Sequence, residues 1–518
     1  MQDLFNLVNF IQKTKFRSSN LLDVIIEPNT HMGLVYSAIA QQNVQTEEAI
    51  VAAYPQFEDE SKLAQAKCKL KDRLLDAVFL LDFKESDYTD RQRAFVVCSR
   101  KWAAGMILMH KNIRQAGINL LEHLLRHTLH FEFTELSMEI LRVLRLHYST
   151  VEGDLKKYHS YESKLQELEE TWLAERKAES WYLELIVQYV NAKADKHIAA
   201  QKAEEYYEQI VPFLNRFSSF KLHLFGRLIE TVIYDSRNDY AGMAAACEQA
   251  IVFFNGKEYK SGLFLQLFYY NLITCYLHMR QFEQGRYYVD KLEQLIEEGS
   301  FNWFKLQELY FYIAMHTENY REAHQVWLRV QEHPEFSSLP PVSAELWKIF
   351  EAYVYFLIQT GVLPLVGEAD QLAKFRINRF LNEVQTFSKD KRGMNISVLI
   401  LQFLFNLSEG KYEQLEERVD AMTKYRTRYL HDKHTLRSNC FIKMLLQIPL
   451  SDFNVNEIRR KTQKTAQLLE DTPWETVNQH REIEIIPYER LWAILLDTCL
   501  GPKRGNGYSG AKQSHMSR

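Results

Sequence analysis

The chain has 518 residues, of which 46% are hydrophobic and 25% are charged, so it is too apolar for a disordered protein and can bury a large core. Its net charge of −4 creates no general field that would attract nucleic acid or anionic lipid. The six cysteines are isolated and form no CxxC pair, which predicts buried thiols in a reducing compartment, the cytoplasm.

The first part of the chain differs from the rest. Pro28 and Pro55 break short apolar segments, and a strongly amphipathic run follows from Ser61 to Leu81. We expect residues 1-88 to form an N-terminal helical cap, because the open end of a helical array needs a polar outer face. A module that docks a partner is the alternative interpretation.

Residues 89-500 carry apolar side chains at helical spacing almost throughout, with no sustained alternating strand pattern. This pattern predicts an all-α fold. Short breaks in this pattern separate segments that are each long enough for a helix. These breaks fall at 111–112, 151–154, 192–196, 237–238, 280–281, 317–319, 362–367 and 409–410. The scarcity of glycine and proline indicates one elongated array of helices instead of separate globular domains.

The segment from Ser261 to Met279 has no charged residue and is close to the length that spans a bilayer. It contains Gln266, Asn271 and His278, and its apolar residues have the spacing of a repeat helix. We therefore expect a buried helix of the array and no membrane contact.

A short pattern recurs at four of the breaks. An aromatic residue stands just after the break, and a small or apolar residue follows three positions later. We expect the aromatic to pack between the two helices of a hairpin, while the small residue lets their backbones approach. The residues are Tyr240 with Met243, Phe282 with Gly285, Tyr320 with Ala323, and Tyr412 with Leu415.

This pattern resembles the tetratricopeptide repeat, in a degenerate form with units longer than the usual 34 residues. The segment from Tyr269 to Leu292 is the most similar. The resemblance implies a right-handed α-solenoid of TPR-like helical hairpins. The chain also looks like uncharacterised bacterial helical-repeat proteins, which imply no particular activity.

The usual catalytic and phosphate-binding motifs are missing from the sequence, so we expect no enzyme, no cofactor and no metal. His123 and His127 share a helix face that could hold a divalent ion, but a polar ridge explains them as well. The spacings Arg142-x4-His147 and Arg426-x4-His431 occur in some helical ribonucleases and also arise by chance.

The array predicts a protein that binds a peptide, a helix or another protein in its concave groove, as an adaptor, scaffold or regulatory subunit. The candidate groove residues are Arg227, Tyr234, Tyr270 and Asn271. A ligand-responsive sensor whose array changes curvature is the first alternative. A helical ribonuclease or a metal-dependent enzyme is the second.

Basic residues gather near the end of the chain. Arg459, Arg460 and Lys461 are consecutive, and residues 501-518 form a basic segment that we expect to be a disordered tail. These groups could meet an acidic partner or RNA, and elsewhere we expect no nucleic-acid contact.

Overall fold

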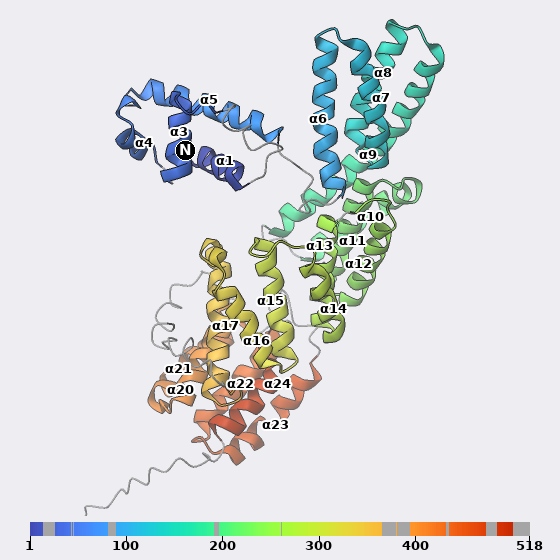
Figure 1. The fold of residues 1–518 in the computed structure, drawn as a ribbon. Coiled ribbons are helices and arrows are strands. Elements are labelled where there is room, and N and C mark those ends of the chain that lie inside the picture. Colours follow the sequence, from blue (N-terminus) through green and yellow to red (C-terminus); the bar gives the residue numbers. More distant parts are fainter. Residues whose placement is uncertain are drawn as a thin grey trace, which may run out of the picture. The chain divides into compact units, whose positions relative to one another are not determined.

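Helices form all the regular secondary structure in the part of the chain that the computed structural model describes (Figure 1). The described residues are 1–13, 26–42, 44, 46–57, 59–80, 90–190, 196–260, 262–364, 380, 394–430, 435–472 and 484–500. The all-α prediction is confirmed for these residues. The predicted tail, residues 501-518, lies outside them.

The chain divides into two compact units. The first comprises Met1–Trp172 with Glu258–Ser261, and the second comprises Leu173–Lys257 with Gly262–Arg518. The predicted cap, residues 1-88, falls within the first unit, and the predicted array contributes to both.

The first unit begins with short helices around their own core. The predicted amphipathic run forms α5, which buries one apolar stripe, including Leu63 and Leu70, against α1 and α3. The N-cap Asp59 accepts a hydrogen bond from the Ser61 N–H and so satisfies one free donor of the first turn of α5. The elements are α1 (Gln2–Lys13), α3 (His31–Gln42), α4 (Glu47–Ala53), a 3₁₀ turn η1 (Pro55–Phe57) and α5 (Glu60–Val78).

Longer antiparallel helices complete the first unit. They are α6 (Asp90–His110), α7 (Arg114–His130), α8 (Thr134–Thr150) and the part of α9 (Leu155–Val190) that ends at Trp172. The Glu122 carboxylate in α7 accepts hydrogen bonds from the Tyr148 hydroxyl of α8 at 2.8 Å and the Tyr161 hydroxyl of α9 at 3.0 Å. One carboxylate therefore links three helices.

The second unit starts with the rest of α9 and continues through a series of consecutively packed helices. Ser219 caps α11 and Asp239 caps α12, each through a side-chain oxygen that accepts a backbone N–H. The helices are α10 (Lys196–Arg216), α11 (Phe220–Arg237), α12 (Tyr240–Asn255), α13 (Gly262–His278) and α14 (Phe282–Glu293).

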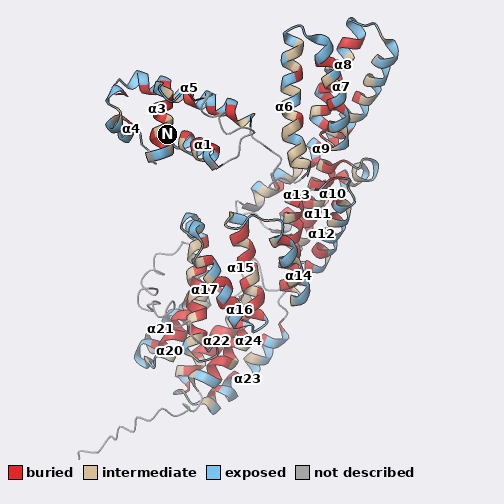
Figure 2. Ribbon diagram, in the orientation of Figure 1, coloured by how far each residue is buried: buried red, intermediate tan, exposed pale blue. Residues whose placement is uncertain are grey.

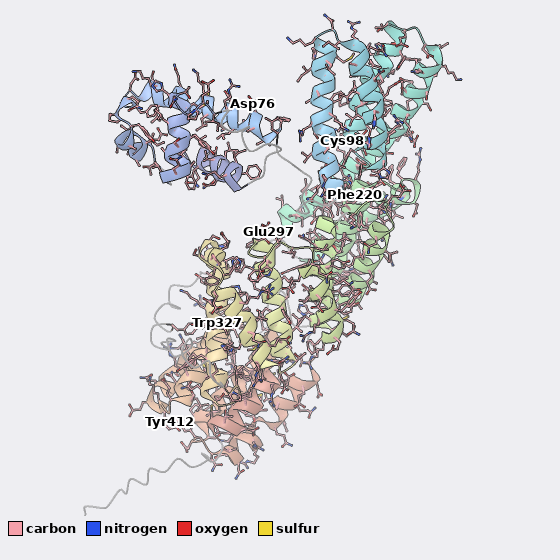
Figure 3. All side chains as sticks on the ribbon, in the orientation of Figure 1. Asp76, Cys98, Phe220, Glu297, Trp327 and Tyr412 are labelled. Carbon is pink, nitrogen blue, oxygen red and sulfur yellow. The ribbon has the colours of Figure 1, made fainter. Side chains whose placement is uncertain are left out.

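The remaining helices of the second unit share one extended core that includes Trp303, Trp347 and Phe441. Figure 2 shows that α20 and α22 are buried along most of their length, and Figure 3 marks Trp327 of α16 and Tyr412 at the start of α21. The elements are α15 (Phe301–His316), α16 (Tyr320–Gln331), the short turn η2 (Pro334–Ser338), α17 (Pro341–Gln359), α20 (Met394–Ser408), α21 (Tyr412–Tyr429), α22 (Leu436–Leu450), α23 (Val455–Asp471), α24 (Tyr488–Ile494) and η6 (Leu495–Cys499).

Most predicted breaks that fall on described residues coincide with helix ends. The apolar segment that begins at Ser261 is the helix α13, whose Leu272, Ile273 and Cys275 are fully buried. Across the described residues, no helix is both long enough and apolar enough to cross a bilayer.

One prediction about the cysteines is wrong. Cys68 in α5 is exposed and Cys499 is half-buried, whereas the other four thiols are buried. Cys68 lies outside the buried stripe of its helix, because the buried positions nearby are Ala66 and Leu70.

Candidate functional site

Several helix ends in the described chain share one geometry. Each ends at a residue with a left-handed backbone, and the N–H of the next residue bonds to the carbonyl five positions back, as in the Schellman motif. Arg280 (φ 58°) and Glu318 (φ 59°) are two examples. The other turns of this kind among the described residues are at Asn112, Glu132, Asn238, Gly410 and Asp452.

The four aromatic residues of the recurring pattern are the first residues of helices. Tyr240 begins α12, Phe282 begins α14, Tyr320 begins α16 and Tyr412 begins α21. Each follows a left-handed residue by two positions. The aromatic pattern in the sequence therefore marks one specific helix-turn-helix geometry.

The packing of these aromatics differs from turn to turn. The Tyr240 ring stacks on His278 at 4.1 Å between ring centroids, and Tyr320 is buried. The Phe282 ring meets His316 edge-on at 5.9 Å. Tyr412 is 47% exposed and packs on Phe453, which follows α22.

The small residues of the pattern lie where two helices approach closely. A Cβ atom added at Gly285 would lie 3.2 Å from the Ile313 Cδ1 atom and 3.6 Å from the Tyr276 Cβ atom. Ala323 is fully buried in the next hairpin. Small side chains at these positions allow the helices to pack at short distance.

The predicted groove residues lie on neighbouring helices of the second unit. Arg227 and Tyr234 lie two turns apart on α11, whereas Tyr270 and Asn271 are adjacent on α13. All four are half-buried.

A polar network surrounds Arg227. Its guanidinium donates to the Glu230 carboxylate at 2.7 Å and to the Gln249 side-chain oxygen of α12 at 3.3 Å. Burial raises the pKa of the Tyr207 hydroxyl on α10, and the nearby Glu230 carboxylate raises it further. Burial also raises the pKa of the Cys247 thiol to about 12, although a hydrogen bond with Asn271 acts in the opposite direction. The network thus links α10, α11 and α12, and Asn271 borders it from α13.

Sequence reasoning did not detect a deeply buried arginine of the second unit. Arg437 on α22 is 1% exposed, and its guanidinium donates to the carboxylates of Glu484 and Glu489. It also donates to the Leu469 and Thr472 carbonyl groups at the end of α23. Burial acts to raise the pKa of Glu489, but the Arg437 guanidinium outweighs burial and lowers it. Arg437 therefore ties α22 and α23 to the segment that leads into α24.

The same segment also meets two of the repeated turns. Arg280 approaches Glu489 at 3.5 Å, and Arg490 pairs with Glu318 at 3.1 Å. Together with His316 these four residues line a cavity of about 320 Å³. Because its cations already face carboxylates, this cavity has little uncompensated charge to offer a ligand.

The histidine pair does not gain further metal ligands. The His123 and His127 rings stack on α7 at 4.8 Å between centroids. Among the described residues, no group of three or more His, Cys, Asp or Glu side chains could hold a metal ion.

The two ribonuclease-like spacings do not assemble a described site. Arg142 pairs with Glu139 at the surface, whereas the buried His147 lies 3.1 Å from Glu152. His431, the second residue of the other spacing, lies outside the described residues.

The basic triplet lies on α23. Lys461 pairs with Glu457 at 2.8 Å, Arg459 lies 3.9 Å from Asp497, and Arg460 is exposed.

Comparison of the chain with models of known protein families, with curated proteins and with solved structures finds no match.

Proposed function

We propose that this chain is a helical-repeat binding protein of the cytoplasm, an adaptor, scaffold or regulatory subunit for a peptide or protein partner. In this proposal the hairpins form a right-handed α-solenoid of TPR-like units. The observation that carries it is the recurrence of one turn geometry at Asn238, Arg280, Glu318 and Gly410. Repeated hairpins with matched turns build an extended surface, and such surfaces serve to bind other molecules.

The proposed contact surface is centred on α11 and α13. Arg227 and Asn271 supply hydrogen-bonding groups, whereas Tyr234 and Tyr270 supply half-buried aromatic rings. Aromatic side chains bury a large area on binding for a small loss of conformational freedom, so they suit the recognition of a peptide or helix.

A tagged full-length chain tests this proposal. It is isolated from cells with and without nuclease treatment, and the stoichiometry of co-purifying proteins is measured by mass spectrometry. We expect a partner at a fixed, nuclease-resistant ratio. The Tyr234→Ala/Tyr270→Ala variant should lose that partner, because truncating central aromatic residues removes much of the binding energy of an interface.

The matched control is Tyr287→Ala on α14. The Tyr287 side chain is 55% exposed and lies outside the proposed surface. If both variants lost the partner equally, or if the chain purified alone, the proposed surface would be wrong. Circular dichroism of each variant establishes that the helices are intact.

A ligand-responsive sensor is the second candidate function. A cationic cavity among α21, α22 and α23 favours it, because a bound ligand could alter how these three helices pack.

A further inference from the structure

Three consecutive helices of the second unit line an open cavity of about 490 Å³, at whose mouth Lys443 and Lys461 are exposed. This volume is within the range of ordinary small-molecule sites. The lining comes from α21, α22 and α23: Thr423, Arg426, Lys443, Leu446, Gln447, Leu450, Lys461 and Thr465.

The charges in this cavity have one sign. Arg426, Lys443 and Lys461 each come from a different helix, and no carboxylate belongs to the lining. Within the described part of the chain, neither Arg426 nor Lys443 makes an ion pair. Lys461 pairs with Glu457, but this contact is an exposed pair on one helix and is therefore weak.

The cavity at Arg280 is a useful contrast, because its arginines face Glu489 and Glu318. In the cavity of α21–α23, Arg426 and Lys443 face no carboxylate among the described residues, and Lys461 has only its exposed pair with Glu457. A ligand with several negative charges would supply the missing counter-charge. The electrostatic attraction is stronger in a recess than on an open surface.

The donor groups indicate the chemistry of that ligand. Arginine and lysine are strong donors to phosphate oxygens, and arginine can donate two parallel hydrogen bonds. Thr423, Thr465 and Gln447 add neutral donors around the same space. A single carboxylate carries one negative charge and would leave two of the three cations without a counter-charge.

The wall of the cavity also has an apolar part. Leu446 is buried, whereas Leu450 is 61% exposed at the end of α22. A wholly inorganic anion would leave these side chains unused, and an organic group could cover them.

We propose that the cavity between α21, α22 and α23 binds a small organic phosphate with at least two negative charges, held by Arg426, Lys443 and Lys461. This site is independent of the partner surface on α11 and α13.

Calorimetric titration of the full chain tests the site, with sodium pyrophosphate and ADP as probes. We expect one saturable site per chain and tighter binding of ADP, because its nucleoside can contact the leucines. Arg426→Gln and Lys443→Gln should each weaken pyrophosphate binding at least tenfold, since each removes a charge-assisted contact.

The matched controls are Lys424→Gln on α21 and Arg460→Gln on α23. They remove the same charge from exposed positions outside the cavity and should change affinity less than threefold. Circular dichroism checks the fold of every variant.

Other outcomes would overturn the proposal. Absence of saturable binding at millimolar pyrophosphate and ADP would exclude the site. Equal weakening by the controls would show a diffuse surface attraction. If ADP bound no more tightly than pyrophosphate, the proposed contact between an organic group and the leucines would be excluded. If a short single-stranded RNA bound more tightly than ADP, and Lys424→Gln weakened it as much as Lys443→Gln, the surface would be a nucleic-acid interface.

Discussion

The Arg437 guanidinium donates to both carboxylate oxygens of Glu489, at 2.7 and 2.8 Å, although the two residues are 52 positions apart in sequence. A buried ion pair of this kind contributes little net stability compared with apolar residues, but removing one partner leaves an uncompensated charge. The contact therefore favours packing of the segment that carries Glu484 and Glu489 against α22 and α23.

Arg437→Met should destabilise the second unit by about 3 to 5 kcal/mol, because the largely buried Glu484 would lose its counter-charge and Glu489 would keep only the more distant Arg280. Hydrogen exchange of peptides from α22 to α24 measures the loss. Adding Glu484→Gln and Glu489→Gln to the variant should restore part of the protection. The exposed Arg460→Met substitution is the control, and an equal loss there would contradict the assignment.

Stability should fall as the pH is lowered from 6.5 towards 4. Burial lowers the pKa values of His223 and His316 to about 4, although a backbone carbonyl hydrogen bond opposes burial at each ring. Between pH 6.5 and 4 the unfolded chain binds more protons at these sites than the folded chain, so acid favours unfolding. Once these sites are fully protonated in the unfolded chain, each histidine has lowered the free energy of unfolding by about 3 kcal/mol.

Urea unfolding midpoints measured between pH 7 and 4.5 check this expectation. His316→Gln should flatten the dependence on pH, because glutamine does not titrate in this range. Its amide can still donate to the Glu484 carbonyl group, which preserves the local contact. His159→Gln changes an exposed histidine and should leave the slope unchanged. A pH dependence identical in all three proteins would contradict the prediction.

Gly410→Ala should destabilise the hairpin of α20 and α21 by about 1 kcal/mol. Gly410 has φ 69°, and an added Cβ atom would meet nothing within 4 Å, so only backbone strain contributes. Gly256→Ala is the control, since Gly256 has φ −75° at the end of α12. Urea unfolding should show a loss for the first variant and none for the second.

Gly285→Leu should destabilise the hairpin of α13 and α14 by about 1 to 3 kcal/mol through overpacking against Ile313 and Tyr276. Gly285→Ala should cost much less, because the Ile313 methyl group can move by the small distance needed, and alanine favours helix. Thermal unfolding of both variants compares them. Equal midpoints would show that the helices are not closely packed at this position.

Cys68 should be the first thiol that iodoacetamide modifies in the folded protein, because it is exposed. Burial raises the pKa values of the Cys98, Cys275 and Cys440 thiols, which slows their reaction further. Intact mass spectrometry should show a fast phase of one adduct that Cys68→Ser removes. Several adducts forming at one rate would contradict this order.

The turns were the most predictable part of the fold, because their chemistry is local. The aromatic at positions such as Phe282 and the break before it are visible in sequence, and the structure starts a helix at each of these residues. The similar turn at Glu132 was missed because Phe131 and Phe133 flank it, so no break in the apolar pattern is visible, and no aromatic begins the helix that follows; α8 starts at Thr134.

The charged clusters were not predictable, because they depend on residues far apart in sequence. An arginine is expected at the surface, and nothing near Arg437 signals that it is buried. Its partners follow it by 47 and 52 residues. Likewise, Lys461 was recognised as part of a basic triplet, but Lys443 joins it only through the packing of α22 on α23.

The distance along the chain between Arg437 and its partners Glu484 and Glu489 has a consequence for biosynthesis. Translation at ~5–20 residues per second delivers Glu489 about 3 to 10 seconds after Arg437 has been made. During that interval Arg437 lacks the carboxylates that neutralise it in the folded protein. Until Glu484 and Glu489 have been made, α22 and α23 should therefore remain more accessible to proteases than in the folded protein.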